Sequence, residues 1–368
     1  MSSSPPLPSS QPSISESYAQ LTALLSPPST ILEIDFLPST YPPHIHYEHP
    51  ALGLPKSLLV KLYLHARTIF FSKDQDGESH YADNELHQGE EDAEDREKRR
   101  LKASAILLLF DPNHLSAINH RKRYINSHLS PNNARASIPH DDPSSGREKE
   151  EEAILPPELT LLTSFLTSPL YKHAKSSTLW AYRLWLVRNY HHHILKASSH
   201  SVVRSGAAAP DAHEIRTRFW ESEIDIVLRA GERHPRNYYA FEYARQLFRF
   251  WAQLSNDNYS PRALVSSLEE TIRRIHTFAL LHTRDISAWS FLLFLIHFYR
   301  STGGSTKFAA DTEGEKKEEE EVVRRVIWET EEWVRKYEWR GESMVWFLRG
   351  LREMQEGSVL GKREILLA

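Results

Sequence analysis

A degenerate internal repeat is the feature that most limits how this chain can fold. Five segments recur in order along the sequence, and each carries a large apolar anchor residue about one turn inside an expected helix. The anchors are Ile118, Trp180, Phe241, Trp289 and Trp346. Generic amphipathic helices with a core tryptophan would explain any single segment. Five ordered copies instead favour one helical unit used repeatedly.

The positions around the anchors predict how each helix begins. The residues four positions before the last four anchors are of the capping or acidic type: Ser176, Asn237, Asp285 and Glu342. Ser, Asn or Asp at such a position can accept hydrogen bonds from the free amides of a new helix. Arg183 and Arg349 follow their anchors by three residues. Each guanidinium is therefore expected beside an indole on the same helix face, where cation–π contact is possible.

Helical spacing of apolar residues dominates the rest of the chain. Within 263–279 one helix face is formed by Leu264, Leu268, Ile272, Ile275 and Ala279. No clear strand-like alternation of apolar and polar residues occurs, and only 31–37 has the character of a short extended segment. The sequence thus predicts an all-α fold of helical hairpin repeats.

Composition predicts how the chain is divided. We expect a disordered Ser/Pro-rich tail over 1–28 and a single α-helical repeat domain over 29–368. Charged or Pro-, Ser- and Gly-rich stretches predict disordered insertions near 72–100, 130–156, 197–211 and 301–321. The anchors are farther apart than the roughly 34 residues of a bare helical hairpin repeat, and the insertions account for the excess.

Charge and cysteine content exclude several classes of function. The 45 Lys and Arg residues nearly balance the 49 Asp and Glu residues, giving a net charge of −4. Such a balance argues against a nucleic-acid or membrane-surface binder. With no Cys in the chain, a disulfide framework, a Cys-ligated zinc and a Cys nucleophile are excluded. His44, His46 and His49 lack a fixed carboxylate pattern, so we expect no metal site.

The apolar stretches are too short for a membrane. The longest, 105–110 and 291–298, fall below the roughly 18 residues that a spanning helix needs. The N-terminus has neither the basic nor the apolar region of a secretory signal. We therefore expect no membrane span and a cytoplasmic location.

The repeated segments resemble the α-subunit repeat of protein prenyltransferases, whose pattern is Lys-Asn-Tyr-x-x-Trp-x-x-Arg. The best matches are 175–185 and 234–241, and the resemblance extends from about residue 100 to 356. The long insertions and the lost tryptophans make the chain most similar to the divergent branch of prenyltransferase α-subunit repeat-containing proteins. The resemblance implies a right-handed superhelical crescent, an α-α solenoid, that wraps a β subunit.

The resemblance also implies a function and a set of site residues. The chain would be the α subunit of a heterodimeric enzyme that transfers farnesyl or geranylgeranyl to protein Cys, active only with its β subunit. No cofactor is expected in this chain, and zinc is expected in the β subunit. Lys175 matches the family's reactive Lys and would assist departure of the diphosphate, while Tyr238 and Tyr239 would contact it.

Simpler interpretations stay open for these residues. Lys175 can be an exposed residue at a helix start, and the two tyrosines can pack between hairpins. The partners implied are the β subunit and, through the dimer, an isoprenoid diphosphate and a Cys-containing protein. The alternative function is a non-catalytic scaffold of the tetratricopeptide type that binds a protein partner.

Overall fold

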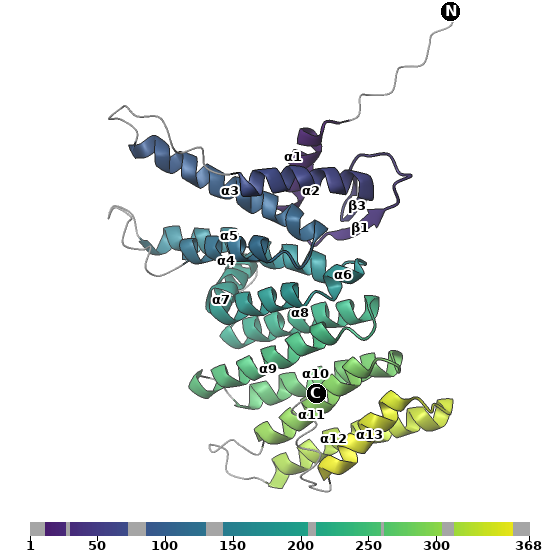
Figure 1. Cartoon of the computed structure of the whole chain (residues 1–368). Coiled ribbons are helices and arrows are strands. Elements are labelled where there is room, and N and C mark those ends of the chain that lie inside the picture. The colour runs from purple at the N-terminus through teal and green to yellow at the C-terminus, as the bar shows by residue number, and fades with distance from the viewer. Residues whose placement is uncertain are drawn as a thin grey trace, which may run out of the picture. The chain divides into compact units, whose positions relative to one another are not determined.

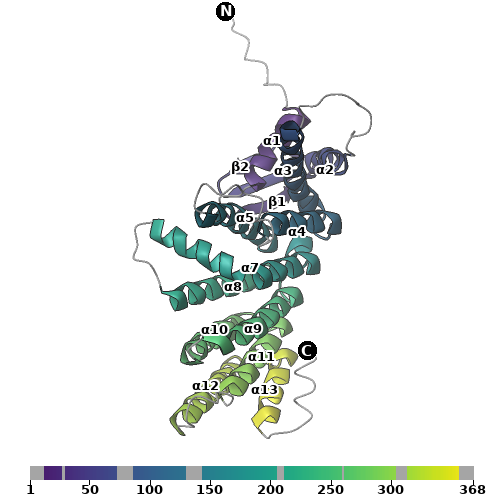
Figure 2. The ribbon, with the colours of Figure 1, turned by 90° about the vertical axis from the view of Figure 1, so that its left-hand side faces the viewer.

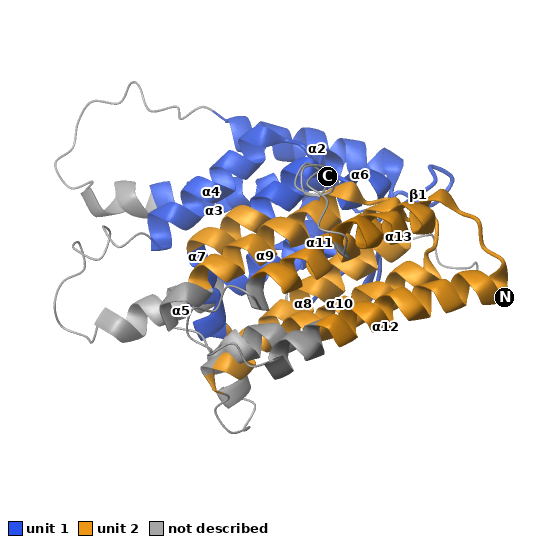
Figure 3. Ribbon diagram, turned by 90° about the horizontal axis from the view of Figure 1, so that it is seen from below, with its two compact units in different colours: residues 1–183, 190–197 blue, residues 184–189, 198–368 orange. Residues whose placement is uncertain are grey.

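The computed structural model describes residues 12–26, 30–72, 86–129, 143–204, 211–258, 261–303 and 313–355. This part of the chain is mostly helical and includes one small sheet (Figure 1). It divides into two compact units, coloured separately in Figure 3. Unit 1 consists of Met1–Arg183 and Tyr190–Ala197, and unit 2 of Leu184–Asn189 and Ser198–Ala368.

Unit 1 begins with helix α1 (Ile14–Leu25), which lies within the tail predicted to be disordered. The prediction over 1–28 is therefore corrected for residues 12–26. Ser13 and Glu16 form a capping box, in which each side chain accepts a hydrogen bond from the other's backbone N–H. Leu21 and Leu25 are fully buried. Capping and burial together overcome the polar composition that suggested disorder.

A three-stranded sheet follows α1, with strand order β1-β3-β2. Its strands are β1 (Glu33–Leu37), β2 (His46–Glu48) and β3 (Ala51–Pro55). Strand β1 runs parallel to β3, and β2 runs antiparallel to it. The Leu32 N–H donates to the Ser164 hydroxyl at 2.8 Å, which joins the sheet to a later helix. The sequence indicated only the segment 31–37, because strands this short leave almost no alternation to detect.

The remainder of unit 1 is helical. Its helices are α2 (Lys56–Phe71), α3 (Leu86–Phe110), α4 (Leu115–Leu129), α5 (Pro143–Leu166), α6 (Tyr171–Ala174) and part of α7 (Ser177–Arg204). Helix α3 contacts α2 and α4, and α4 contacts α5. Residues 103–109 of α3 are fully buried. This apolar stretch forms the centre of the unit's core, since a helix that is apolar on all sides must be covered on all sides.

Unit 2 contains three helical hairpins. They pair α8 (Ala212–Arg233) with α9 (Tyr238–Asn258), α10 (Pro261–Leu281) with α11 (Ile286–Gly303), and α12 (Glu313–Tyr337) with α13 (Glu342–Gln355). The first helices form one layer, in which α10 contacts α8 and α12. The second helices form another, in which α11 contacts α9 and α13 (Figure 2). Within unit 2, the repeat is thus a hairpin stacked on its neighbours.

Helices extend into all four predicted insertions. Helices α3, α5 and α12 begin at Leu86, Pro143 and Glu313, and α7 ends at Arg204. Runs of Glu, Lys and Arg have good helix propensity, which favours helix in the extended parts of α3, α5 and α12. The remaining parts of these insertions, 73–85, 130–142, 205–210 and 304–312, lie outside the described residues. In the described helices, none has the length and apolar character needed to cross a membrane.

Candidate functional site

Four of the five expected anchors lie in the core. Ile118, Trp180, Phe241 and Trp289 are each at most 3% exposed. The fifth, Trp346, is 37% exposed, whereas its neighbour Phe347 is fully buried. The Phe347 ring centroid lies 4.9 Å from that of Trp289. In α13 the buried aromatic is therefore one residue later than the sequence pattern indicated, and Arg349 is exposed.

Two anchor tryptophans make the same hydrogen bond in their own units. The indole Nε1–H of Trp180 donates to the carbonyl of Ala174 at 2.8 Å. The indole Nε1–H of Trp289 donates to the carbonyl of Thr283 at 3.1 Å. In both cases the acceptor lies six residues before the anchor. The two residues thus occupy equivalent places in their hairpins, and their polar atoms are used by the fold.

The residue four positions before each anchor caps a helix in four of the five segments. Ser176, Asn237 and Asp285 accept hydrogen bonds from N–H groups in the first turns of α7, α9 and α11. His114 does the same in α4, where its Nδ1 accepts from the Ala117 N–H at 3.2 Å. The sequence did not single out His114, although its position before Ile118 was a signal. Glu342 is instead the first residue of α13.

Two of these caps also reach the turn of the preceding hairpin. In unit 1 the Ser176 hydroxyl donates to Asn113 Oδ1 at 2.8 Å. In unit 2 the Asp285 Oδ2 accepts from the backbone N–H of Arg236 at 2.8 Å. Asn113 and Arg236 each come directly before the capping residue of their own helix. The repeat therefore includes a polar contact that fixes one turn against the next.

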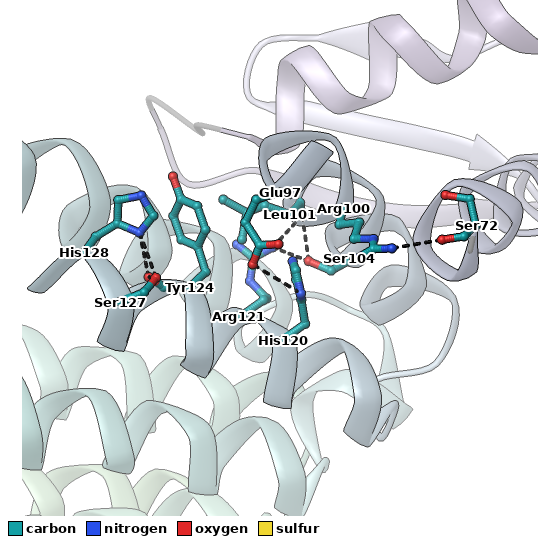
Figure 4. A network of polar contacts seen from close by, with 10 residues as sticks. All are labelled: Ser72, Glu97, Arg100, Leu101, Ser104, His120, Arg121, Tyr124, Ser127 and His128. Carbon is teal, nitrogen blue, oxygen red and sulfur yellow. Dashed lines mark hydrogen bonds and ion pairs between the residues drawn. The ribbon is translucent and has the colours of Figure 1, made fainter. Parts of the chain in front are cut away.

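Two of the arginines near the anchors, Arg183 and Arg121, are structural. Arg183 is buried and donates to the Leu159 carbonyl at 3.2 Å and the Thr163 hydroxyl at 3.0 Å. Arg121 is its equivalent after Ile118, and it donates to Ser104 Oγ at 2.7 Å (Figure 4). These guanidinium groups satisfy buried acceptors inside unit 1.

Arg121 belongs to a buried ion pair. Its Nε donates to Glu158 Oε1 at 2.7 Å, its Nη2 pairs with Oε2, and the Tyr182 hydroxyl donates to Oε1 at 2.8 Å. Burial opposes the charge on Arg121, but Glu158 outweighs it and raises the pKa of the guanidinium above its ordinary value. Burial, followed by the Glu158 charge, raises the pKa of Tyr182. Both shifts leave Arg121 charged and Tyr182 neutral at neutral pH.

A hollow of about 920 Å³ in unit 1 is lined mainly by residues of α4 and of the end of α2. Its basic lining residues are Arg100, His120, Lys122 and Arg123. Several of them already have contacts within the fold. Arg100 Nη2 donates to the Ser72 carbonyl at 2.9 Å, and His120 Nδ1 lies 3.7 Å from Glu97 Oε1 (Figure 4). Burial lowers the pKa of His120, so this ring is neutral at pH 7.

The residues predicted to contact diphosphate do not lie together in one unit. Lys175 follows α6 in unit 1, and its Nζ lies 4.9 Å from the centre of the Tyr171 ring. Tyr238 and Tyr239 begin α9 in unit 2, are 51% and 42% exposed, and have ring centroids 5.8 Å apart. No cluster of three or more potential metal-binding side chains occurs in the described chain.

The two tyrosines lie on what we call the turn edge of unit 2. It comprises the turns 234–237, 282–285 and 338–341 within the three hairpins, together with the helix ends beside them. Exposed large side chains gather along it: Tyr238, Tyr239, Leu281, Ile286 and Tyr337. Adjacent turns are in contact, because Asp285 binds the N–H of Arg236 and the Arg284 guanidinium lies 5.6 Å from the Trp339 ring centre.

One basic residue from each turn lines a second hollow, which we call the arginine hollow. Its volume is about 390 Å³, and its lining residues are Arg236, Thr283, Arg284, Trp339, Arg340, Gly341, Glu342 and Ser343. A partial signal for this hollow is present in the sequence, since Arg236 and Arg284 directly precede the capping residues Asn237 and Asp285. Arg340 precedes Gly341, which is not one of the capping-type residues, so its sequence position did not link it to Arg236 and Arg284.

One family match bears on this region. Residues 209–313 match the family described as the ECM9 middle domain. That range covers α8 to α11, and so includes the turns that carry Arg236 and Arg284. No curated protein matches the chain. The match corrects the resemblance to the prenyltransferase α-subunit repeat: the family found is a different one. The motif Lys-Asn-Tyr-x-x-Trp suggested the wrong family because its capping and anchor residues here start helices and pack them against one another.

Proposed function

We propose that this protein is a helical-repeat scaffold that binds a protein partner along the turn edge of unit 2. The observation that carries the proposal is the composition of that edge, where exposed Tyr238, Tyr239 and Tyr337 alternate with Arg236, Arg284 and Arg340. Tyr and Arg are the residues most enriched among those that dominate protein–protein binding energy. Stacked hairpins that continue as a solenoid would present such residues as one extended surface.

The contacts that the motif's polar groups make also support a scaffold function. Arg121, Arg183, Ser176 and Asp285 make contacts inside the fold. Groups used in this way hold helices in register and are not available to a substrate. A catalytic site would require several polar groups converging on one accessible point.

Prenyl transfer is not part of this proposal. That expectation came from the family resemblance, which the family match does not support. Lys175 belongs to unit 1, where it lies over Tyr171, whereas the two tyrosines belong to unit 2. A cytoplasmic location stays a prediction from the sequence.

Comparing two variants of the full chain tests the proposal. The edge variant replaces Tyr238, Ile286 and Tyr337 by Ser, and the control variant replaces Val60, Leu64 and Trp328, which are similarly exposed elsewhere. Proteins captured by wild-type chain are quantified by mass spectrometry for all three forms, after melting curves show that each is folded. We expect partners to be lost from the edge variant alone. Equal capture by all three forms would refute a binding role for the edge.

A further inference from the structure

The arginine hollow brings together three basic groups that have no acidic partner among the described residues. In the part of the chain that the structure describes, Arg236, Arg284 and Arg340 form no ion pair with a carboxylate. Other arginines of the same unit are paired: Arg218, Arg245, Arg273, Arg274, Arg324, Arg335 and Arg352. Within the described residues, Arg249, Arg300, Arg325 and Arg349 of unit 2 also lack an ion pair. The hollow is therefore distinguished by the meeting of three such arginines in one place.

The other groups around the arginine hollow are mostly hydrogen-bond donors too. Gly341, Glu342 and Ser343 are at the start of α13, where backbone N–H groups have no acceptor within the helix. Glu342 is the single acidic residue of the lining, against three arginines. Donors and positive charge in one concave site favour an oxyanion, because an anion would satisfy both.

The geometry of the fold holds the backbone of Arg236 and the side chain of Arg284 in place. Asp285 binds the backbone N–H of Arg236 and directly follows Arg284, so one carboxylate fixes both turns. Arg284 lies against the Trp339 ring, a contact that orients the guanidinium plane. Trp339 in turn packs on Gly341, where an added Cβ would lie 2.4 Å from the indole Nε1. A site with side chains fixed in this way loses less entropy when a ligand binds.

We propose that the arginine hollow binds the oxyanion of a partner's side chain, either a phosphoryl group or a carboxylate. The inference rests on the proposed function, and it adds the chemistry of the residue that the scaffold recognises. A volume of about 390 Å³ is near the lower end of ligand pockets, which suits a single side chain better than a nucleotide. Planar guanidinium groups bind both oxyanions through paired hydrogen bonds, and the double charge of a phosphoryl group strengthens them.

The test measures binding of small probes to the full chain at constant ionic strength. The probes are inorganic phosphate, O-phosphoserine, O-phosphotyrosine and glutamate, titrated by calorimetry up to about 10 mM. The pocket variant is Arg236→Gln, Arg284→Gln, Arg340→Gln. The control variant is Arg218→Gln, Arg273→Gln, Arg335→Gln, which removes the same charge from side chains that are 56%, 61% and 69% exposed.

We expect the wild type and the control to bind a phosphoamino acid, and the pocket variant to bind it about 10-fold more weakly or worse. Preference for the phosphoamino acids over glutamate identifies a phosphorylated partner, and equal binding identifies an acidic one. Binding of inorganic phosphate alone, equal losses in both variants, or no binding of any probe would overturn the inference. If the edge variant loses partners while the pocket variant binds probes normally, the inference fails and the scaffold function stands.

Discussion

Asp285 holds the backbone of Arg236, a residue 49 positions earlier, through a 2.8 Å hydrogen bond from the Arg236 N–H to its Oδ2. Its other oxygen, Oδ1, accepts from the Ser287 and Ala288 N–H groups and so caps α11. Arg236 has φ of 60°, a left-handed conformation that costs a residue with a side chain roughly 1 kcal/mol. One buried carboxylate therefore stabilises a helix start and an unfavourable turn in the hairpin before it.

Replacing Asp285 should test this double role. We expect Asp285→Ala to lower the free energy of unfolding by about 2–3 kcal/mol, since it removes a cap and leaves a backbone N–H without its acceptor. Asp285→Asn should cost less, because its amide oxygen still caps α11. Urea unfolding of the full chain measures both. The control is Asp225→Ala, whose exposed pair with Arg274 should contribute under about 1 kcal/mol; equal losses at 285 and 225 would contradict the assignment.

The buried pair of Arg121 and Glu158 gives a second prediction. Arg121→Met should destabilise unit 1 by about 3–5 kcal/mol, because it leaves the Glu158 carboxylate buried without its cation. The double variant Arg121→Met, Glu158→Met should recover much of that loss, since no buried charge remains. Thermal unfolding of the wild type, both single variants and the double variant completes a double-mutant cycle, which measures the coupling energy between the two residues. Additive losses in the double variant would show that the two residues act independently.

The sequence was sufficient to predict helices and a repeat, but not the exact position of every residue. Apolar spacing located helices because one stripe of each must face a core. The anchor rule placed Ile118, Trp180, Phe241 and Trp289 in buried positions, but for α13 it selected Trp346 over Phe347. Both are aromatic and adjacent, so composition alone does not decide which of them faces α11. Packing against Trp289 does.

The candidate site was harder to predict because it depends on contacts between turns. Sequence spacing drew attention to Lys175 and Tyr238 through a family motif, and that motif reflects helix capping here. The arginine hollow is formed by residues from three turns, of which Arg236 and Arg340 are more than 100 positions apart. Arg236 and Arg340 come close together because α8, α10 and α12 stack on one another, and a local sequence pattern cannot predict that stacking. The small sheet escaped prediction for a similar reason, since β1 pairs with β3 and not with its neighbour in sequence.

The equivalence of Trp180 and Trp289 predicts equal sensitivity to a conservative change. Replacing either by Phe removes the hydrogen bond to the carbonyl six residues earlier and leaves a small cavity. We expect each variant to lose about 2–3 kcal/mol of unfolding free energy. Trp346→Phe is the matched control, and it should lose under about 0.5 kcal/mol because this side chain is 37% exposed. Urea unfolding measures the free energy of unfolding of the three variants. A larger loss of this free energy for Trp346→Phe than for Trp180→Phe or Trp289→Phe would contradict the assignment of Trp180 and Trp289 as the buried anchors.

The pH dependence of stability should report on His173. This residue is buried in unit 1, and its Nε2–H donates to the carbonyls of Leu109 at 2.9 Å and Leu108 at 3.1 Å. Burial lowers its pKa from 6.5 to about 4, although the two carbonyls act in the opposite direction. The folded protein therefore resists protonation of His173, whereas the unfolded chain binds that proton below its ordinary pKa of 6.5.

The sign of the effect follows from that difference. Above pH 6.5 both states are neutral at His173 and stability is unaffected by this group. As the pH falls from 6.5 to 4, the unfolded state binds more protons, so stability decreases, by about 3 kcal/mol for a shift of this size. Below pH 4 the folded state is protonated as well and the loss from this group levels off. His276, with a pKa also lowered to about 4, adds a similar decline in the wild type.

Comparison with His173→Gln separates the two histidines. Glutamine keeps an N–H donor for the carbonyls of α3 and does not titrate, so His276 contributes equally to both proteins. We expect the variant to be less stable than the wild type at pH 7, because its shape fits the site less well, and its stability to fall less steeply between pH 6.5 and 4. Urea unfolding at half-unit pH intervals gives both curves. Parallel curves across that interval would mean that His173 has the same pKa in the folded and unfolded chains. Burial of the ring among Phe36, Phe165 and the end of α3 would then not disfavour the protonated, charged imidazolium.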